Sequence, residues 1–121
     1  MSDVEILILE DEALIAMDIQ MTLEDAGHNS ISVCSSVDDA MILIEKDLPK
    51  VAVLDFNLGN GTTSVSVAEK LSENGVPFIF LSGYTESTVR IPDEFSSAGR
   101  LAKPFQSAEL VSKVRSTLKS T

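Results

Sequence analysis

Three short runs of consecutive apolar residues constrain the fold of this chain more than any other feature of its sequence. They span residues 6–9, 51–54 and 78–81, with the sequences ILIL, VAVL and FIFL. Apolar runs of this length without polar alternation are typical of strands buried on both faces of a parallel sheet. Two weaker segments, residues 31–34 and 99–102, bring the expected number of strands to five.

Between these runs, apolar residues recur at the spacing of amphipathic helices. Four stripes are present: Ile15, Ile19, Thr22, Leu23 and Ala26; Val37, Ala40, Met41 and Ile44; Val67, Ala68 and Leu71; and Leu110, Val111, Val114 and Leu118. Residues 85–90 are poor helix formers with Pro92 close behind, so we expect a short or mobile helix there. Because parallel strands need crossover helices, the alternation predicts an α/β fold, a doubly wound five-stranded parallel sheet with helices on both faces.

Length and charge limit the functions that fit this chain. Its 121 residues match one ordinary domain, so we expect a single domain over residues 1–121. The formal net charge is −10 and the nine Lys and Arg form no cluster, which argues against nucleic-acid binding. No apolar stretch approaches the ~20 residues that span a bilayer, and no secretory leader is evident. We therefore expect neither membrane insertion nor export.

Polar residues follow four of the five expected strands. In doubly wound sheets, chemistry belongs beyond the carboxyl ends of the strands, so these residues are the candidates for a site. With the strand order 2-1-3-4-5, the ends of the first and third strands are neighbours. The four strand ends carry Glu10-Asp11-Glu12, Asp55-Phe56-Asn57, Ser82-Gly83 and Lys103-Pro104.

Three of these residues, Glu10, Asp11 and Asp55, are acids that face each other in this order of strands. Like charges at close range are unfavourable, and either a proton or a cation must relieve them. Carboxylate oxygens with room for water suit Mg²⁺ better than zinc, because the chain has only one cysteine and one histidine. The sequence therefore indicates a magnesium site.

Cys34 and His28 have ordinary interpretations. Cys34 lies in an apolar segment and is expected to be a buried free thiol, which suits a reducing cytoplasm. His28 precedes the second expected strand, at the opposite edge of the sheet from Asp55, and is expected to be a plain surface residue.

The four strand-end segments together resemble the response-regulator receiver family, and the resemblance covers essentially the whole chain. Each segment alone has a simpler interpretation, such as helix-terminal acids or a solvated lysine, but their joint occurrence favours one site. The resemblance implies the flavodoxin-like, CheY-like fold and a phosphoacceptor switch that promotes its own phosphotransfer and self-dephosphorylation. The matched segments are ILILEDE at 6–12, VLDFNL at 53–58, FLSG at 80–83 and KPF at 103–105.

The family's roles carry over position by position. The resemblance implies that Asp55 is the phosphoacceptor and that Glu10 and Asp11 bind Mg²⁺ directly or through water. It implies that Asn57 is a metal ligand through its backbone carbonyl. Ser82 would donate a hydrogen bond to the phosphoryl group, and Lys103 would pair with it, usually beside a cis bond to the following proline. The partners implied are a histidine kinase or phosphotransfer protein and a downstream protein.

The sequence departs from the usual family pattern near the switch. Most receivers have Ala after the switch hydroxyl and an aromatic residue three positions before the lysine, where this chain has Gly83 and Arg100. Residues 77–84, PFIFLSGY, instead resemble a subgroup that is often single-domain and often paired with HWE or HisKA2 histidine kinases. We expect Tyr84, the only tyrosine, to carry part of the conformational signal, because it directly follows Gly83.

Other function classes remain open at this point. The leading interpretation is a stand-alone cytoplasmic response regulator that signals through protein contacts or drains phosphate. A phosphorylation-independent pseudo-receiver is the alternative, although Asp55, Ser82 and Lys103 are all present. A flavodoxin-like protein lacks support because the chain has no Trp and one Tyr, and an aspartyl-phosphate hydrolase would normally have its nucleophile on the first strand. Fold alone does not separate these classes.

Overall fold

The computed structural model describes residues 5–59, 61–83, 95 and 98–119. Within them, strands and helices alternate along the chain. The strands are β1 (Ile6–Leu9), β2 (Ile31–Cys34), β3 (Val51–Asp55), β4 (Phe78–Gly83) and β5 (Gly99–Lys103), and the helices are α1 (Ala13–Asp25), α2 (Val37–Lys46), α3 (Val65–Glu73) and α4 (Ser107–Lys119).

The five strands form one parallel sheet in the order β2-β1-β3-β4-β5, which confirms the predicted topology. The paired residues of neighbouring strands run in sequence without a bulge, so that Leu9 is in register with Leu54 and Asp55 with Leu81. Strands β1 and β3 are neighbours although α1, β2 and α2 separate them in the chain. The residues that follow β1 and the last residue of β3 therefore meet at one edge of the sheet.

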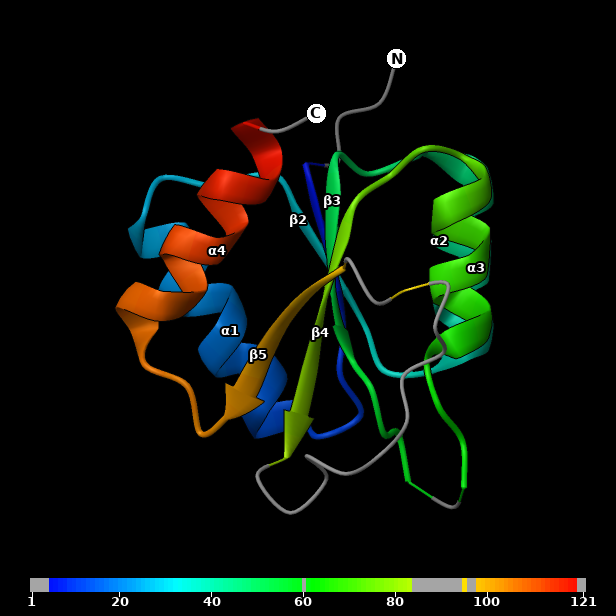
Figure 1. Ribbon diagram of the computed structural model, residues 1–121, viewed down its shortest axis with the longest axis horizontal. Coiled ribbons are helices and arrows are strands. Elements are labelled where there is room, and N and C mark those ends of the chain that lie inside the picture. Colours follow the sequence, from blue (N-terminus) through cyan, green and yellow to red (C-terminus); the bar gives the residue numbers. More distant parts are fainter. Residues whose placement is uncertain (1–4, 60, 84–94, 96–97, 120–121) are drawn as a thin grey trace.

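Helices cover both faces of this sheet, with α1 and α4 on one side and α2 and α3 on the other (Figure 1). Alternate residues of β1 and β3 point to opposite faces, so the sheet divides the core into two clusters. Ile8 and Val53 pack with Ile19 of α1 and Val114 of α4, whereas Leu54 packs on the side of α2 and α3. The four helical stripes predicted from the sequence supply the packed faces.

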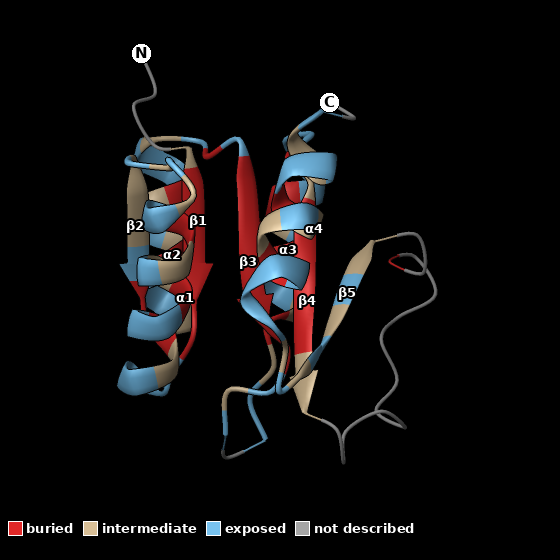
Figure 2. Cartoon of the chain, turned by 90° about the vertical axis from the view of Figure 1, so that its left-hand side faces the viewer, coloured by how far each residue is buried: buried red, intermediate tan, exposed pale blue. Residues whose placement is uncertain are grey.

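The central strands are buried and the edge strands are not (Figure 2). Every residue of β1 and β3 is buried, whereas β2 and β5 contain exposed and partly exposed residues. This difference explains why the edge strands gave the weaker apolar signals in the sequence, because a strand with one free edge needs fewer apolar side chains.

Local signals mark the ends of three of the helices. Ser36 caps α2 by accepting a hydrogen bond on its side chain from the backbone N–H of Asp39 at 3.2 Å. Gly27 and Gly75 follow α1 and α3 with φ values of 101° and 72°, a conformation that favours glycine. No helix among the described residues is long and apolar enough to cross a membrane.

Three expectations need comment. Cys34 is a buried free thiol, as expected, and its S–H donates to the carbonyl of Ile8. The prediction for His28 was wrong, because its side chain is 12% exposed and its Nδ1 lies 2.7 Å from Oε1 of Glu5. The expected short helix at residues 85–90 and the switch residue Tyr84 lie outside the described residues.

Candidate functional site

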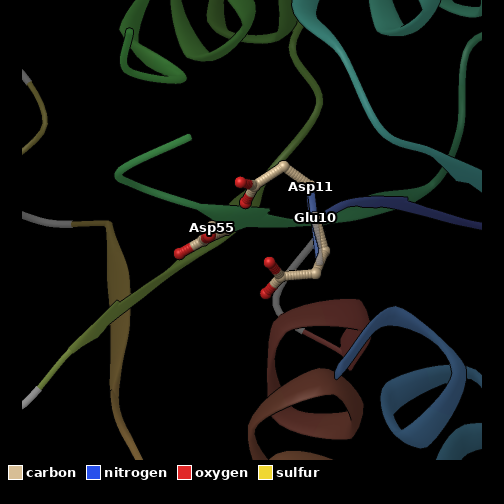
Figure 3. A group of neighbouring side chains, drawn as sticks. All are labelled: Glu10, Asp11 and Asp55. Carbon is tan, nitrogen blue, oxygen red and sulfur yellow. The ribbon is translucent and has the colours of Figure 1, made fainter. Parts of the chain in front are cut away.

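Three carboxyl groups meet at the carboxyl edge of the sheet. Glu10 and Asp11 directly follow β1, and Asp55 is the last residue of β3. One carboxylate oxygen of each of the three residues lies within 4.8 Å of the corresponding oxygens of the other two. Figure 3 shows the three side chains gathered beside the ends of these two strands. The sequence prediction that these acids face each other is therefore confirmed.

Lys103 brings one positive charge to the acids from the end of β5. Its Nζ donates to Oε1 of Glu10 at 2.8 Å and lies 3.2 Å from Oδ1 of Asp55. The side chain is 19% exposed, so most of the amine's surroundings are protein. The bond between Lys103 and Pro104 is cis, as the family resemblance implied.

Glu10 is held on both of its carboxylate oxygens. Oε1 accepts the hydrogen bond from Lys103, and Oε2 accepts one from the backbone N–H of Glu12 at 3.1 Å. The residue is buried, at 1% exposed. Its carboxylate is therefore oriented by the chain itself, because two donors fix a planar group more firmly than one.

Asp11 is exposed and lies over the loop that follows β3. A Cβ atom at Gly59 would lie 3.7 Å from Oδ2 of Asp11, which places this carboxylate close to the loop backbone. The side chain of Asn57 accepts a hydrogen bond from the backbone N–H of Gly59 at 2.9 Å, which closes the turn. Asn57 thus follows β3 at the acidic cluster, with its side chain engaged in the loop.

Ser82 and Gly83 end β4 beside the other site strands. Leu81, the residue before Ser82, is in register with Asp55, and its carbonyl accepts from the backbone N–H of Phe56 at 2.8 Å. Gly83 is in register with Lys103. Both Ser82 and Gly83 are partly exposed. The register therefore puts the predicted switch hydroxyl one residue beyond the level of Asp55 on the neighbouring strand.

The charges at this edge are not balanced, because three carboxylates share one amine. Burial, followed by the nearby Glu10 carboxylate, raises the pKa of Asp55 from 3.8 to about 7, although Lys103 opposes the shift. Burial alone would lower the pKa of Lys103, but its hydrogen bond to Glu10 and the charges of Asp55 and Glu10 raise it above 10.5. Lys103 therefore stays positively charged, but its single charge does not offset the burial of Asp55 and the negative charge of Glu10.

This arrangement fits a hard divalent cation. The donors are carboxylate oxygens, one of which, on Asp11, is open to solvent and leaves room for water. A cation beside Asp55 would relieve the same repulsion and desolvation that raise its pKa. Receiver domains generally bind Mg²⁺ at an acidic cluster of this kind.

Two pairings of charged or polar side chains escaped the sequence reasoning, one at the site and one at the opposite edge of the sheet. The direct pairing of Glu10 with Lys103 joins residues 93 positions apart, and strand-end position does not reveal in which direction each side chain turns. The pairing of His28 with Glu5 at the opposite edge was also missed. Glu5 precedes β1 and His28 precedes β2, and these two strands are neighbours, which is a signal that could have identified this pair.

A doubly wound parallel sheet with an acidic cluster at its carboxyl edge defines a flavodoxin-like α/β protein of the CheY-like kind. The sequence matches the profile of the response regulator receiver domain over residues 6–115. The chain therefore belongs to the receiver family, whose members are phosphoacceptor switches of two-component systems.

Individual relatives agree with this assignment. The chain is 37% identical over 108 residues to the phyllosphere-induced regulator PhyR of Methylorubrum extorquens, an alignment that covers 88% of this chain and 40% of that protein. The solution structure of SdrG from Sphingomonas melonis has a TM-score of 0.79 and 34% identity, covering 98% of this chain and 99% of that one.

A crystal structure of a response regulator receiver protein from Sinorhizobium medicae has a TM-score of 0.79 and 28% identity, covering 97% of this chain and 95% of that one. The chain spans about half, or less, of the length of the curated relatives it matches.

Proposed function

We propose that residues 1–121 form one receiver domain, in which Asp55 accepts a phosphoryl group from a histidine kinase or phosphotransfer protein in the presence of Mg²⁺. The observation that carries this proposal is the meeting of Glu10, Asp11, Asp55 and Lys103 in one cluster at the carboxyl edge of the sheet. An acceptor carboxylate beside two further acids needs a cation. Nζ of Lys103 lies 3.2 Å from Oδ1 of Asp55, so the amine can pair with an oxygen of a phosphoryl group that arrives at Asp55.

Asp11, Asp55 and the backbone carbonyl of Asn57 would hold the ion directly, and Glu10 would contact it through water. This division follows from the hydrogen bonds, because both oxygens of Glu10 already accept from donors of the chain. Asp11 is exposed and its carboxylate has no ion pair among the described residues. The bound ion would offset negative charge on the transferring phosphoryl oxygens.

In the transfer itself, a carboxylate oxygen of Asp55 would form a bond to phosphorus as the bond from phosphorus to the donor histidine nitrogen breaks. The imidazole leaves with the electron pair of that bond. Lys103 would pair with a phosphoryl oxygen, and Ser82 would donate a hydrogen bond to another. No general base is required, because Asp55 reacts as a carboxylate.

The output would be a protein contact controlled by Ser82, Gly83 and Tyr84. Phosphorylation changes the charge on the acceptor from one to about two negative units, which can draw the Ser82 hydroxyl toward the phosphoryl group. Gly83 gives the strand end conformational freedom, and Tyr84 follows it. Replacing Tyr84 with Ala should reduce the phosphorylation-induced NMR shifts and the affinity for the kinase. Unchanged shifts and affinity would remove Tyr84 from the proposal.

Three finer points complete the proposal. The segment PFIFLSGY at residues 77–84 supports a kinase of the HWE or HisKA2 type. The near-complete mutual coverage with SdrG supports a stand-alone regulator that signals by protein contacts. The single buried thiol of Cys34, whose pKa is raised to about 12 by burial and by the Asp39 charge, suits a reducing cytoplasm.

The test is direct labelling with a small phosphodonor. Wild-type protein incubated with Mg²⁺ and acetyl phosphate should gain the mass of one phosphoryl group, located on Asp55 by peptide mapping. Asp55→Ala should gain none, and omission of Mg²⁺ should suppress the gain. Absence of label on the wild type, or equal label on Asp55→Ala, would contradict the proposal and favour a phosphorylation-independent binding module.

A further inference from the structure

An apolar groove of about 510 Å³ runs along the outer edge of the sheet, between α1 and α2. Its floor is β2, which pairs with β1 alone among the strands that the structure describes, and Glu10 and Asp11 also belong to the lining. Pockets of this size accept several side chains rather than a single ion. The groove includes neither Asp55 nor Lys103, although Glu10 and Asp11 belong both to it and to the acidic cluster.

The lining residues recur at helical spacing on α1 and on α2, which flank the β2 edge of the sheet from its two faces. Ala16, Met17 and Gln20 come from one side of α1, and Ile42 and Leu43 from one side of α2, with Val33 of β2 between them. Met17 is 53% exposed and Ile42 is 54% exposed. Large apolar side chains that gather at one groove mark a binding surface more often than exposed apolar residues that are scattered singly.

The charge around this groove has one sign. The first 45 residues contain eleven Asp and Glu and no Lys or Arg, whereas the remaining residues contain eight acids and nine bases. All of α1 and most of α2 belong to this first part. Asp11 and Asp39 line the groove, are exposed, and form no ion pair with any described residue. The net negative charge of the chain is therefore concentrated in the segment that supplies the groove, and the charged residues that line it are all acids.

We propose that the groove between α1 and α2 is a docking site for a partner protein that presents a basic amphipathic helix. The apolar face of that helix would cover Met17, Val33 and Ile42, and its Lys or Arg residues would meet Asp39, which takes no part in the metal site. The methionine suits such a contact, because its unbranched side chain adapts to different apolar partners.

The same charges disfavour other occupants. A second copy of this chain docked by the same face would bring two acidic surfaces together, and nucleic acid or an anionic membrane would also be repelled. A strand added to the sheet is disfavoured because β2 has only four residues and offers a short edge. The proposal goes beyond phosphoryl transfer, which requires only the cluster around Asp55.

The probe is a synthetic 18-residue peptide with leucines on one helical face and lysines on the other. Titrated into ¹⁵N-labelled wild-type protein, it should shift amide resonances of α1, β2 and the first turns of α2. A peptide of the same composition in scrambled order should bind at least about tenfold more weakly, because it cannot present an apolar face. Equal affinity of both peptides would mean that binding depends only on their net charge, and it would overturn the proposal.

A pair of variants tests the position of the site. Met17→Ser combined with Ile42→Ser should lower the affinity for the amphipathic peptide about tenfold. Met21→Ser is the matched control, because Met21 is 55% exposed on the same helix but does not line the groove. The control should bind within about twofold of wild type. Equal loss in both variants, or resonance shifts centred on α4 or β5, would contradict the assignment.

The same variants separate this inference from the phosphoacceptor proposal. Labelling by acetyl phosphate needs no docked protein, so the Met17→Ser and Ile42→Ser variant should label like wild type and melt at a similar temperature. Loss of peptide binding with labelling intact supports the groove. A wild-type protein that binds the amphipathic peptide but takes no label would contradict the phosphoacceptor proposal alone.

Discussion

Acids lie beside a basic side chain at both edges of the parallel sheet, but the number of acids for each base differs. At the amino edge, Glu5 meets one basic group, because Nδ1 of His28 lies 2.7 Å from its Oε1. At the carboxyl edge, Glu10, Asp11 and Asp55 share the single amine of Lys103. One edge is a matched pair and the other contains an excess of negative charge.

This difference indicates which edge of the sheet lowers the free energy of unfolding of the domain. A matched pair holds adjacent strands together, whereas a cluster of like charges opposes folding until a cation or a phosphoryl group with its counter-charges arrives. The raised pKa of Asp55 is the mark of that unrelieved charge. Variants that remove a charge from one edge at a time test whether the two edges differ in this way.

Removing the amine should have the largest effect. Lys103→Met keeps the length of the side chain but leaves the phosphoryl oxygens without an ammonium, so acetyl phosphate should label Asp55 about 100-fold more slowly. Lys70→Met is the control, because Lys70 pairs with Glu45 at 3.5 Å on the helical face away from the site. A time course of intact mass measures both. Equal rates in Lys103→Met and wild type would remove the amine from the mechanism.

Neutralising the acceptor should stabilise the metal-free protein. The folded state holds a proton on Asp55 up to about pH 7 and the unfolded state only to about 3.8, so stability falls as the pH rises between these values. Asp55→Asn should therefore be more stable than wild type at pH 8 by about 2 kcal/mol in urea unfolding. At pH 3 the two should differ little. If Asp55→Asn were less stable than wild type at pH 8, the claim that excess negative charge destabilises the carboxyl edge would be contradicted.

Breaking the matched pair should have the opposite sign and a smaller size. Glu5→Ala leaves His28, whose Nε2 is already buried without a hydrogen-bond partner among the described residues, without its contact at Nδ1. Stability should fall by about 1 kcal/mol, with labelling of Asp55 unchanged. Urea unfolding and acetyl phosphate labelling measure the two effects. If Glu5→Ala slowed labelling as much as Lys103→Met does, the edges would not be independent.

The sequence was sufficient for the fold because its signals are periodic and local. Runs such as ILIL at residues 6–9 define buried central strands, and the requirement for crossover helices leaves few topologies. The edge strands β2 and β5 were harder to recognise because half-exposed strands tolerate polar residues. Strand-end position also brought Asp55 and Lys103 together correctly, since parallel strands end at the same edge.

The direction of side chains was not predictable in the same way. Glu10 stands beside Asp11 in the sequence, yet it turns to Lys103 and to the backbone of Glu12. His28 was expected on the surface because a lone histidine carries no pattern, and its partner Glu5 directly precedes the neighbouring strand β1. The exposed apolar groove between α1 and α2 was missed because each helix alone looks like an ordinary amphipathic helix.

The most direct measurement of the account is a titration of the Asp55 carboxyl carbon by ¹³C NMR, assigned by the resonance that Asp55→Asn removes. Without Mg²⁺, the midpoint should lie at about 7, and saturating Mg²⁺ should lower it, because the cation supplies the charge that Lys103 alone does not. A midpoint near 3.8 under both conditions would contradict the claim that unrelieved negative charge is concentrated at this edge of the sheet.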